Sequence, residues 1–364
     1  MRPENQEGPP KFENIGGAAD SNPSGLKRWV TSMIMRRHSD LTRRDRLREK
    51  AERKREGNRL AHEIHYFNEL NDGYSLLAIQ ILERLQTEYD VVLNCHIAET
   101  EISSNIPEPA LLQKLSLTDG KLIASHYGLF FPNTDEPSTN ETLNLAKRVA
   151  IPLAEENAFI ELASLTLASI SNDVEKIHEI GKRHVKASDE ETTNTILQSN
   201  SLRKKLGHYS GAMFHYAGEW YWGIDRIHHL EKRLVDLGVR KNRSEHLIWP
   251  KPTISLGPLK DRKTLILKFF PSLRSPYTSI IFDKTLHLAR ETNIQLEISP
   301  VLPMVMRGVP ATRRKGAYII SDTAREAQSM NIKWGQKVYD PIGEPVINCY
   351  SLYSWAQEKG LGGE

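Results

Sequence analysis

The sequence is poor in cysteine: its 364 residues include only Cys95 and Cys349, and no CxxC pair. It therefore encodes neither a dithiol redox centre nor a cysteine-based zinc site, because both need closely spaced thiols. A single disulfide between the two positions is one interpretation. Isolated thiols in a cytoplasmic protein more often serve as small core residues, and the sequence favours that interpretation.

Long apolar runs are also absent. No stretch approaches the roughly 20 apolar residues of a membrane span, and the N-terminal MRPENQEGPP lacks the pattern of a secretory signal. We therefore expect a cytoplasmic protein without a membrane partner. The sequence has no Walker loop, no GxGxxG turn and no GxSxG elbow, so the common nucleotide-binding and serine hydrolase motifs are missing.

Charge is unevenly distributed. The net charge is +3, yet residues 26–59 hold 13 Lys and Arg against 5 Asp and Glu. Residues 1–25 are rich in Pro, Gly, Asn and Glu and are predicted to be disordered. The basic segment is predicted to be helical, in two pieces, with Ser39 capping the second piece and Asp40 in its first turn.

The basic segment has two interpretations. One is an arm that binds nucleic acid or an anionic membrane. The other is a connecting helix whose Trp29, Ile34 and Leu41 pack on a domain. No interleaved aromatic residues or glycine-rich RNA-binding pattern accompany the charge. We therefore predict a connecting helix and no nucleic-acid partner.

From residue 60 the pattern indicates alternating strands and helices. Residues 63–67 and 91–97 are predicted strands, and 76–89 is an amphipathic helix between them. This β-α-β order requires parallel strands and a right-handed crossover. Residues 141–206 are predicted to be helical almost throughout.

An aromatic hairpin and a last helix complete the first predicted domain, which spans 60–238. The hairpin covers 213–223, and the helix covers 225–238, with Gly238 as its stop. Residues 239–262 contain proline, glycine and mixed charges and are predicted to form a linker.

The β-α-β pattern then recurs at a constant offset of 203. Residues 64–97 align with 267–300 without a gap, so that Tyr74 meets Tyr277 at the start of the helix. Such a long-period repeat indicates a duplication. The second domain, 263–364, has no counterpart of the closing hairpin and helix, and we expect a truncated second copy.

The second copy places Ser-Pro-Tyr-Thr between a strand and a helix, within residues 269–280. A helix N-terminus stabilises anions through its free N–H groups and its dipole. Thiol redox proteins place a CxxC pair at such a helix N-terminus, where the same field lowers the pKa of a thiol. Ser275 and Thr278 occupy the two cysteine positions, and a hydroxyl can donate a hydrogen bond to a bound thiolate.

These segments resemble a family. The SPYT turn looks like the active-site turn of kappa-class glutathione transferases and 2-hydroxychromene-2-carboxylate isomerases, in the DsbA-like branch of the thioredoxin superfamily. Residues 298–306, 315–332 and 220–234 are similar to further family segments. The resemblance implies an α/β, thioredoxin-like fold with a helical insertion at 141–206, here duplicated and preceded by a basic helical arm.

The resemblance also implies a chemistry that uses glutathione as cofactor. Its thiolate adds to a small unsaturated carbonyl substrate, permits rotation about the resulting single bond, and leaves. Ser275 would be the catalytic residue that steadies the thiolate. The expected glutathione-binding residues are Pro276, Tyr277, Thr278, Asp225 and Arg226, and charge-assisted bonds from the last two would hold the γ-glutamyl end.

The first copy departs from the family pattern. Asp72 stands at the catalytic serine position, where a carboxylate would repel a thiolate. The cis-proline of the thioredoxin family is missing, because the segment 210–214 reads SGAMF. The first copy therefore has the Asp-Arg pair without the serine, and the second has the serine without the pair.

His228 and His229 stand near Glu231 on the predicted last helix. Consecutive helical residues point to different faces, so packing or surface roles are favoured and no metal site is predicted.

The leading hypothesis is a glutathione-dependent isomerase-like enzyme. The alternative is a non-catalytic thioredoxin-fold binding or scaffold protein, and a thiol-disulfide oxidoreductase is third. The oligomeric state cannot be inferred from the sequence.

Overall fold

The structure is a computed structural model. It describes residues 21–100, 103, 105–106, 108–134, 136–253, 257–307, 309, 311–335 and 338–361. The disorder predicted for residues 1–25 lies mostly outside the described residues. The described chain divides into two compact units: unit 1 lies within Met1–Leu47, Ser103–Pro107 and Ile254–Glu364, and unit 2 within Arg48–Ile102 and Glu108–Thr253.

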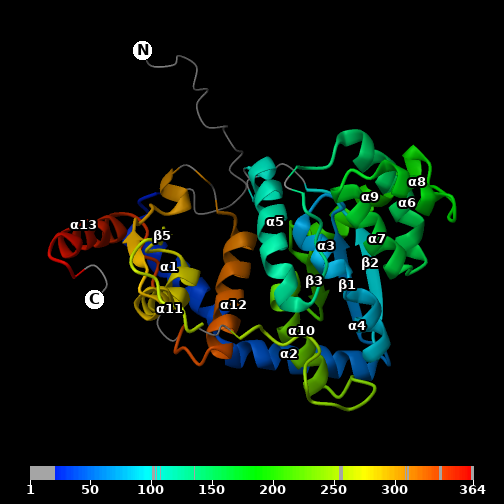
Figure 1. Ribbon diagram of the computed structural model, residues 1–364. Helices are drawn as coiled ribbons and strands as arrows, with labels where there is room; N and C mark the ends of the chain where they lie inside the picture. The colour runs from blue at the N-terminus through cyan, green and yellow to red at the C-terminus, as the bar shows by residue number, and fades with distance from the viewer. Residues whose placement is uncertain are drawn as a thin grey trace. The chain divides into compact units, whose positions relative to one another are not determined.

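Unit 2 contains a four-stranded mixed sheet (Figure 1). Its strands are β1 Glu63–Asn68, β2 Val92–Ile97, β3 Met213–Tyr216 and β4 Glu219–Trp222, in the order β2-β1-β3-β4. β1 and β2 are parallel, and the other two pairs are antiparallel. The predicted β-α-β order and aromatic hairpin are confirmed. Ala217 and Gly218 form the two-residue hairpin turn with φ of 44° and 86°, the left-handed values that tight hairpins require.

The helices of unit 2 are α3 Gly73–Ile79, α4 Leu82–Glu88, α5 Pro109–Ala124, α6 Asn140–Glu155, α7 Phe159–Ile170, α8 Val174–Gly181, α9 Asp189–Leu206 and α10 Ile227–Asp236, with the 3₁₀ turns η1 Ser125–Tyr127 and η2 Ile224–Arg226. The prediction of a single helix over 76–89 is wrong. The Ile81 N–H bonds the Ala78 carbonyl at 3.3 Å, and this tight turn separates α3 from α4.

The helical content predicted for 141–206 is confirmed by α6 to α9. The stop predicted at Gly238 is also confirmed, because Gly238 has φ of 69° two residues after α10 ends at Asp236. Residues 239–253 pack on unit 2: Trp249 is buried, and its N–H donates to the Glu231 carboxylate at 2.8 Å.

The core of unit 2 forms on one face of its sheet. Alternate residues of each strand point to the same face, and Tyr66 on β1 packs against Phe214 on β3 with ring centroids 4.6 Å apart. Leu93 and Cys95 of β2 are buried in the same cluster. Cys95 is therefore a core residue, as the sequence favoured, and both cysteines are free thiols.

A buried ion pair joins the end of β1 to α9. The Arg203 guanidinium donates to Glu69 Oε1 at 2.7 Å, and their side chains are 2% and 4% exposed. Arg203 also donates to the Glu99 carbonyl at 2.6 Å, and Thr100 donates to Glu69. Gly211 packs on this pair, because a Cβ there would lie 2.7 Å from the Glu69 side chain. The helical segment α6 to α9 is thus joined to the sheet by charge as well as by apolar packing.

Unit 1 contains a smaller parallel sheet. The elements of unit 1 are β5 Ile266–Phe269, α11 Pro276–Thr292, β6 Gln295–Ile298, η3 Met304–Arg307, α12 Arg313–Ser329, α13 Glu344–Glu358 and α1 Gly25–Ser39. The helix α2 Leu41–Gly57 belongs to unit 1 up to Leu47 and to unit 2 after it. The strands pair with Ile266 opposite Gln295. In unit 2, Glu63 lies opposite Val92, so the register is the same after a shift of 203 residues.

The basic segment is two helices, as predicted, but its contacts differ from the prediction. Trp29 and Ile34 are 57% and 53% exposed, so the prediction that they pack on a domain is wrong. The polar face of α1 makes the contacts instead, because buried Ser32 accepts a hydrogen bond from the Asp340 N–H at 3.0 Å. Arg36 donates to the Val338 carbonyl at 3.1 Å.

The predicted cap of the second helix is also wrong. Asp40, not Ser39, caps α2, because its carboxylate accepts the Arg43 N–H at 3.0 Å. Ser39 ends α1 and donates to the Gly335 carbonyl at 3.2 Å. Among the described residues, none of the helices combines the length and apolar character needed to span a bilayer.

Breaking the buried pair should destabilise unit 2. Arg203→Met leaves the Glu69 carboxylate buried without its cation, so we expect a loss of about 3 kcal/mol or more in the free energy of unfolding, measured by urea denaturation. Adding Glu69→Gln to Arg203→Met should recover part of the loss. Lys176→Met, which breaks the exposed pair with Glu179, is the control and should change stability by less than about 1 kcal/mol. An equal effect of the two single variants would contradict the assignment.

Candidate functional site

The predicted active-site turn forms the N-terminus of α11. Ser275 is the N-cap, with extended backbone, and its hydroxyl accepts the Thr278 N–H at 3.4 Å. Pro276 occupies the first helical turn, where its missing N–H costs nothing. Ser275 is partly exposed, and within the described part of the chain its hydroxyl donates to no protein group. Its proton therefore remains available to a ligand at the helix end.

Tyr277 and Thr278 support this turn from within the protein. The Tyr277 hydroxyl donates to Asp322 Oδ2 at 2.7 Å, and the Asp322 carboxylate is paired with Arg325 at 2.7 Å. The Thr278 hydroxyl accepts the Ser272 N–H at 3.3 Å. Both residues therefore hold the strand-to-helix connection in shape.

An unpredicted ion pair fixes the residue before the cap. The Arg274 guanidinium makes two bonds to the carboxylate of buried Asp340, at 2.7 and 2.8 Å. A planar guanidinium bound at two points has little freedom. Because 66 residues separate the partners, no local sequence signal could have paired Arg274 with Asp340.

Unit 2 also has a side-chain cap at the start of the helix that follows its first strand, but the capping residue is an aspartate. Asp72 caps α3, and its carboxylate accepts the Ser75 N–H and hydroxyl, both at 2.8 Å. Burial of the carboxyl, and next the charge of Glu69, raise the pKa of Asp72 to about 6. The residue as a whole keeps part of its surface exposed.

A tyrosine-aspartate bond recurs in the two units. The Tyr74 hydroxyl donates to Asp119 Oδ2 at 2.9 Å, as Tyr277 does to Asp322. Tyr277 lies 203 residues after Tyr74, and Asp322 lies 203 residues after Asp119. The offset found in the sequence over 64–97 therefore extends in the structure to the helices α5 and α12, which supply the two aspartates.

The structure brings Asp225 and Arg226 to the Asp72 turn. They lie in η2, which contacts α3 within unit 2. The Asp225 carboxylate and the Arg226 guanidinium are 3.9 Å apart. Ser275 belongs to the other unit, so no single unit contains both the serine and the Asp-Arg pair, as the sequence indicated.

Two cavities open beside the carboxyl ends of the parallel strands of unit 2. The smaller, about 240 Å³, is lined by Leu70, Asn71, Ile97, Ala98, Glu99, Thr100, Leu143 and Lys147. The larger, about 690 Å³, lies between α6, α8 and α9. Glu99 and Lys147 line both cavities and form an ion pair with each other. Unit 2 therefore has room for a small polar ligand close to the Asp72 turn.

The segment expected to carry the cis-proline has another conformation. Ala212, which precedes β3, has φ of 54°, and the described residues contain no cis peptide bond. Its N–H and side chain lie in a fully buried position.

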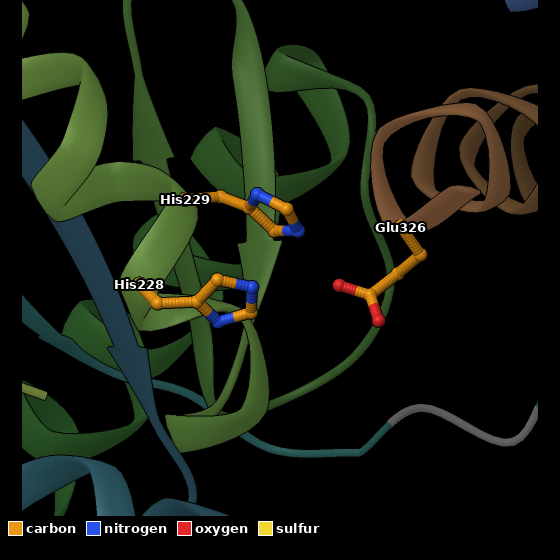
Figure 2. Close-up of side chains that lie close together, drawn as sticks. All are labelled: His228, His229 and Glu326. Carbon is orange, nitrogen blue, oxygen red and sulfur yellow. The ribbon is translucent and has the colours of Figure 1, made fainter. Parts of the chain in front are cut away.

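The two consecutive histidines of α10 lie close together, although consecutive helical residues were expected to point to different faces. The rings of His228 and His229 have centroids 3.9 Å apart (Figure 2). Glu326, also labelled in Figure 2, belongs to unit 1. Glu231, which the sequence placed beside the histidines, is fully buried and accepts the Tyr89 hydroxyl at 2.8 Å. Its carboxylate therefore has a structural role.

No protein-family model matches the chain, and no curated protein matches it.

The raised pKa of Asp72 predicts a stability change that depends on pH. A carboxyl whose folded pKa lies above its unfolded value loses stability as pH rises from about 4 to about 6, and the penalty is complete above that. Asp72→Asn keeps a capping oxygen and removes the charge. We therefore expect it to raise the unfolding free energy by up to about 3 kcal/mol at pH 8, with little effect at pH 4.

Urea denaturation at the two pH values measures this difference. Asp173→Asn, at the exposed N-cap of α8, is the matched control and should shift the midpoint little at either pH. A destabilised Asp72→Asn at pH 8 would show that the ionised carboxylate is needed in the fold.

Proposed function

We propose that the two units are related thioredoxin-like domains of the glutathione-dependent isomerase type. The strand order β2-β1-β3-β4 of unit 2, with the first pair parallel and the rest antiparallel, supports the thioredoxin-like assignment of that unit. In unit 1, the β5-α11-β6 element has the same strand register as its counterpart in unit 2.

The observation that carries the proposal is the repeated strand-to-helix turn. In each unit a capping side chain ends the loop, and the tyrosine two residues later donates to an aspartate 45 residues further along. Only tertiary structure joins the tyrosine to the aspartate, so chance agreement in a short motif does not explain the match. A duplication would account for both the shared capping position and the shared tyrosine-aspartate bond.

The Ser275 turn has the chemistry needed to receive a thiol ligand. The α11 N-terminus supplies N–H groups and the positive end of a 17-residue helix, which favours an anion. The Ser275 hydroxyl has a proton to donate and is partly exposed. Bound there, glutathione would supply a nucleophilic thiolate for addition to an unsaturated carbonyl substrate and for the later elimination.

Protein residues would have three tasks in that chemistry. Ser275 donates a hydrogen bond to the sulfur and thereby favours its ionised form. Tyr277 and Thr278 keep the turn in place through their bonds to Asp322 and Ser272. Pro276 fixes the first helical residue.

Unit 2 supports a different role. Asp72 at the capping position is ionised above about pH 6 and then offers only acceptors, which suit a thiolate poorly. Asp225 and Arg226 lie in η2, which contacts the helix that Asp72 caps, so the γ-glutamyl binding role implied for them would act in unit 2. We therefore propose that unit 2 is a non-catalytic domain that binds small polar ligands.

Calorimetric titration tests the role of Ser275. Glutathione at pH 8 should bind the protein, and Ser275→Ala should raise Kd about tenfold or more, because a hydrogen bond to a charged group is worth roughly 1.5–3 kcal/mol. S-methylglutathione has no thiolate, so its Kd should be the same for both proteins. Ser351→Ala, at an exposed serine of α13, is the control.

The outcomes separate the alternatives. Binding of glutathione that Ser275→Ala does not weaken would remove Ser275 from the site. No binding to the folded protein would reject the enzyme hypothesis and favour a scaffold. Reduction of a disulfide substrate would instead support the oxidoreductase.

A further inference from the structure

Three histidines lie on the same face of the sheet of unit 2, with His96 opposite Phe67, two residues beyond His65 on β1. His65 is on β1, His96 on β2 and His215 on β3, and His65 and His215 are cross-strand partners. Because side chains alternate along a strand, this face is opposite to the one that carries Ile64 and Tyr66 in the core. All three histidines are partly exposed.

Two of the imidazoles direct nitrogen atoms at each other. His65 Nδ1 and His96 Nε2 are 3.0 Å apart, and the two rings lie 28° from parallel. Two nitrogen ligands of a tetrahedral Zn²⁺, each about 2.0–2.1 Å from the ion, are roughly 3.3 Å apart. Separation of the rings by a few tenths of an ångström would therefore admit a metal ion between the two nitrogens.

The other nitrogen of His65 faces a carboxylate at a distance somewhat beyond a direct hydrogen bond. His65 Nε2 lies 3.8 Å from Glu63 Oε1, and the Asn94 amide donates to the same oxygen at 2.6 Å. A carboxylate beside the second ring nitrogen orients a ligating histidine and increases its basicity. Here the carboxylate is itself held by a hydrogen bond.

The two rings are also held on their remaining sides. His96 stacks on buried Phe67 with centroids 4.9 Å apart, and the His215 ring lies 6.1 Å from that of His65.

We propose that His65 Nδ1 and His96 Nε2 form a binding site for a divalent transition metal such as Zn²⁺. Water completes the coordination, and Glu63 orients His65. Imidazole nitrogens suit Zn²⁺, Cu²⁺ and Ni²⁺, whereas Ca²⁺ and Mg²⁺ require oxygen ligands. The site lies on the sheet face of unit 2 and does not depend on the proposed glutathione chemistry.

Calorimetric titration with Zn²⁺ at pH 7.5 tests this site. We expect His65→Ala and His96→Ala each to raise Kd at least tenfold, and Glu63→Gln to raise it less. Ca²⁺ should give no heat of binding. His246→Ala, at an exposed histidine of the same unit, and His229→Ala, at the adjacent histidine pair of α10, are controls that should leave Kd unchanged.

A measurement on the unmodified protein covers the case in which a variant fails to fold. X-ray absorption of the protein loaded with one equivalent of Zn²⁺ should show two imidazole nitrogens at about 2.0 Å with oxygen ligands completing the shell. Binding that persists in both His65→Ala and His96→Ala, a loss caused by His229→Ala, or an absorption spectrum without two imidazoles would each overturn the proposal.

Discussion

Parallel pairing of two strands is the constraint on which each unit depends. Parallel neighbours cannot be joined by a hairpin, so the chain must cross over the sheet through helix before the second strand begins. The crossover helix starts where the first strand ends, and its N-terminus lies at the carboxyl edge of the sheet. Asp72 and Ser275 stand at these N-termini because β1 and β5 end a few residues earlier.

A buried ion pair fixes the arrangement of the chain beside each of the two turns. In unit 2 the Glu69 carboxylate, three residues before Asp72, is paired with Arg203 from α9. In unit 1 the Asp340 carboxylate holds Arg274. Each pair joins the strand-to-helix connection to a segment remote in sequence. Such pairs add little net stability when intact, but removal of one partner is costly, so they fix one arrangement of the chain.

Local pattern sufficed for much of the fold. The short apolar and aromatic runs 63–67 and 91–97 predicted β1 and β2, and the Ala217-Gly218 turn between aromatic residues predicted the hairpin, because both signals arise within a few residues. The signal for helix was equally local over 141–206. The split between α3 and α4 was missed, since a single tight turn at Ile81 leaves the apolar periodicity almost unchanged.

The sequence by itself determined the strands β1 and β2, the aromatic hairpin and the helical content of 141–206, since each of these signals arises within a few neighbouring residues. Tertiary structure alone decided which side chains meet: Tyr74 with Asp119, Arg203 with Glu69, and His65 with His96. It also decided which side chains of α1 make contacts: Ser32 and Arg36 bond to unit 1, while Trp29 and Ile34 stay exposed. The physical reason is that packing and charge pairing depend on three-dimensional proximity, which periodicity along one helix or strand does not encode.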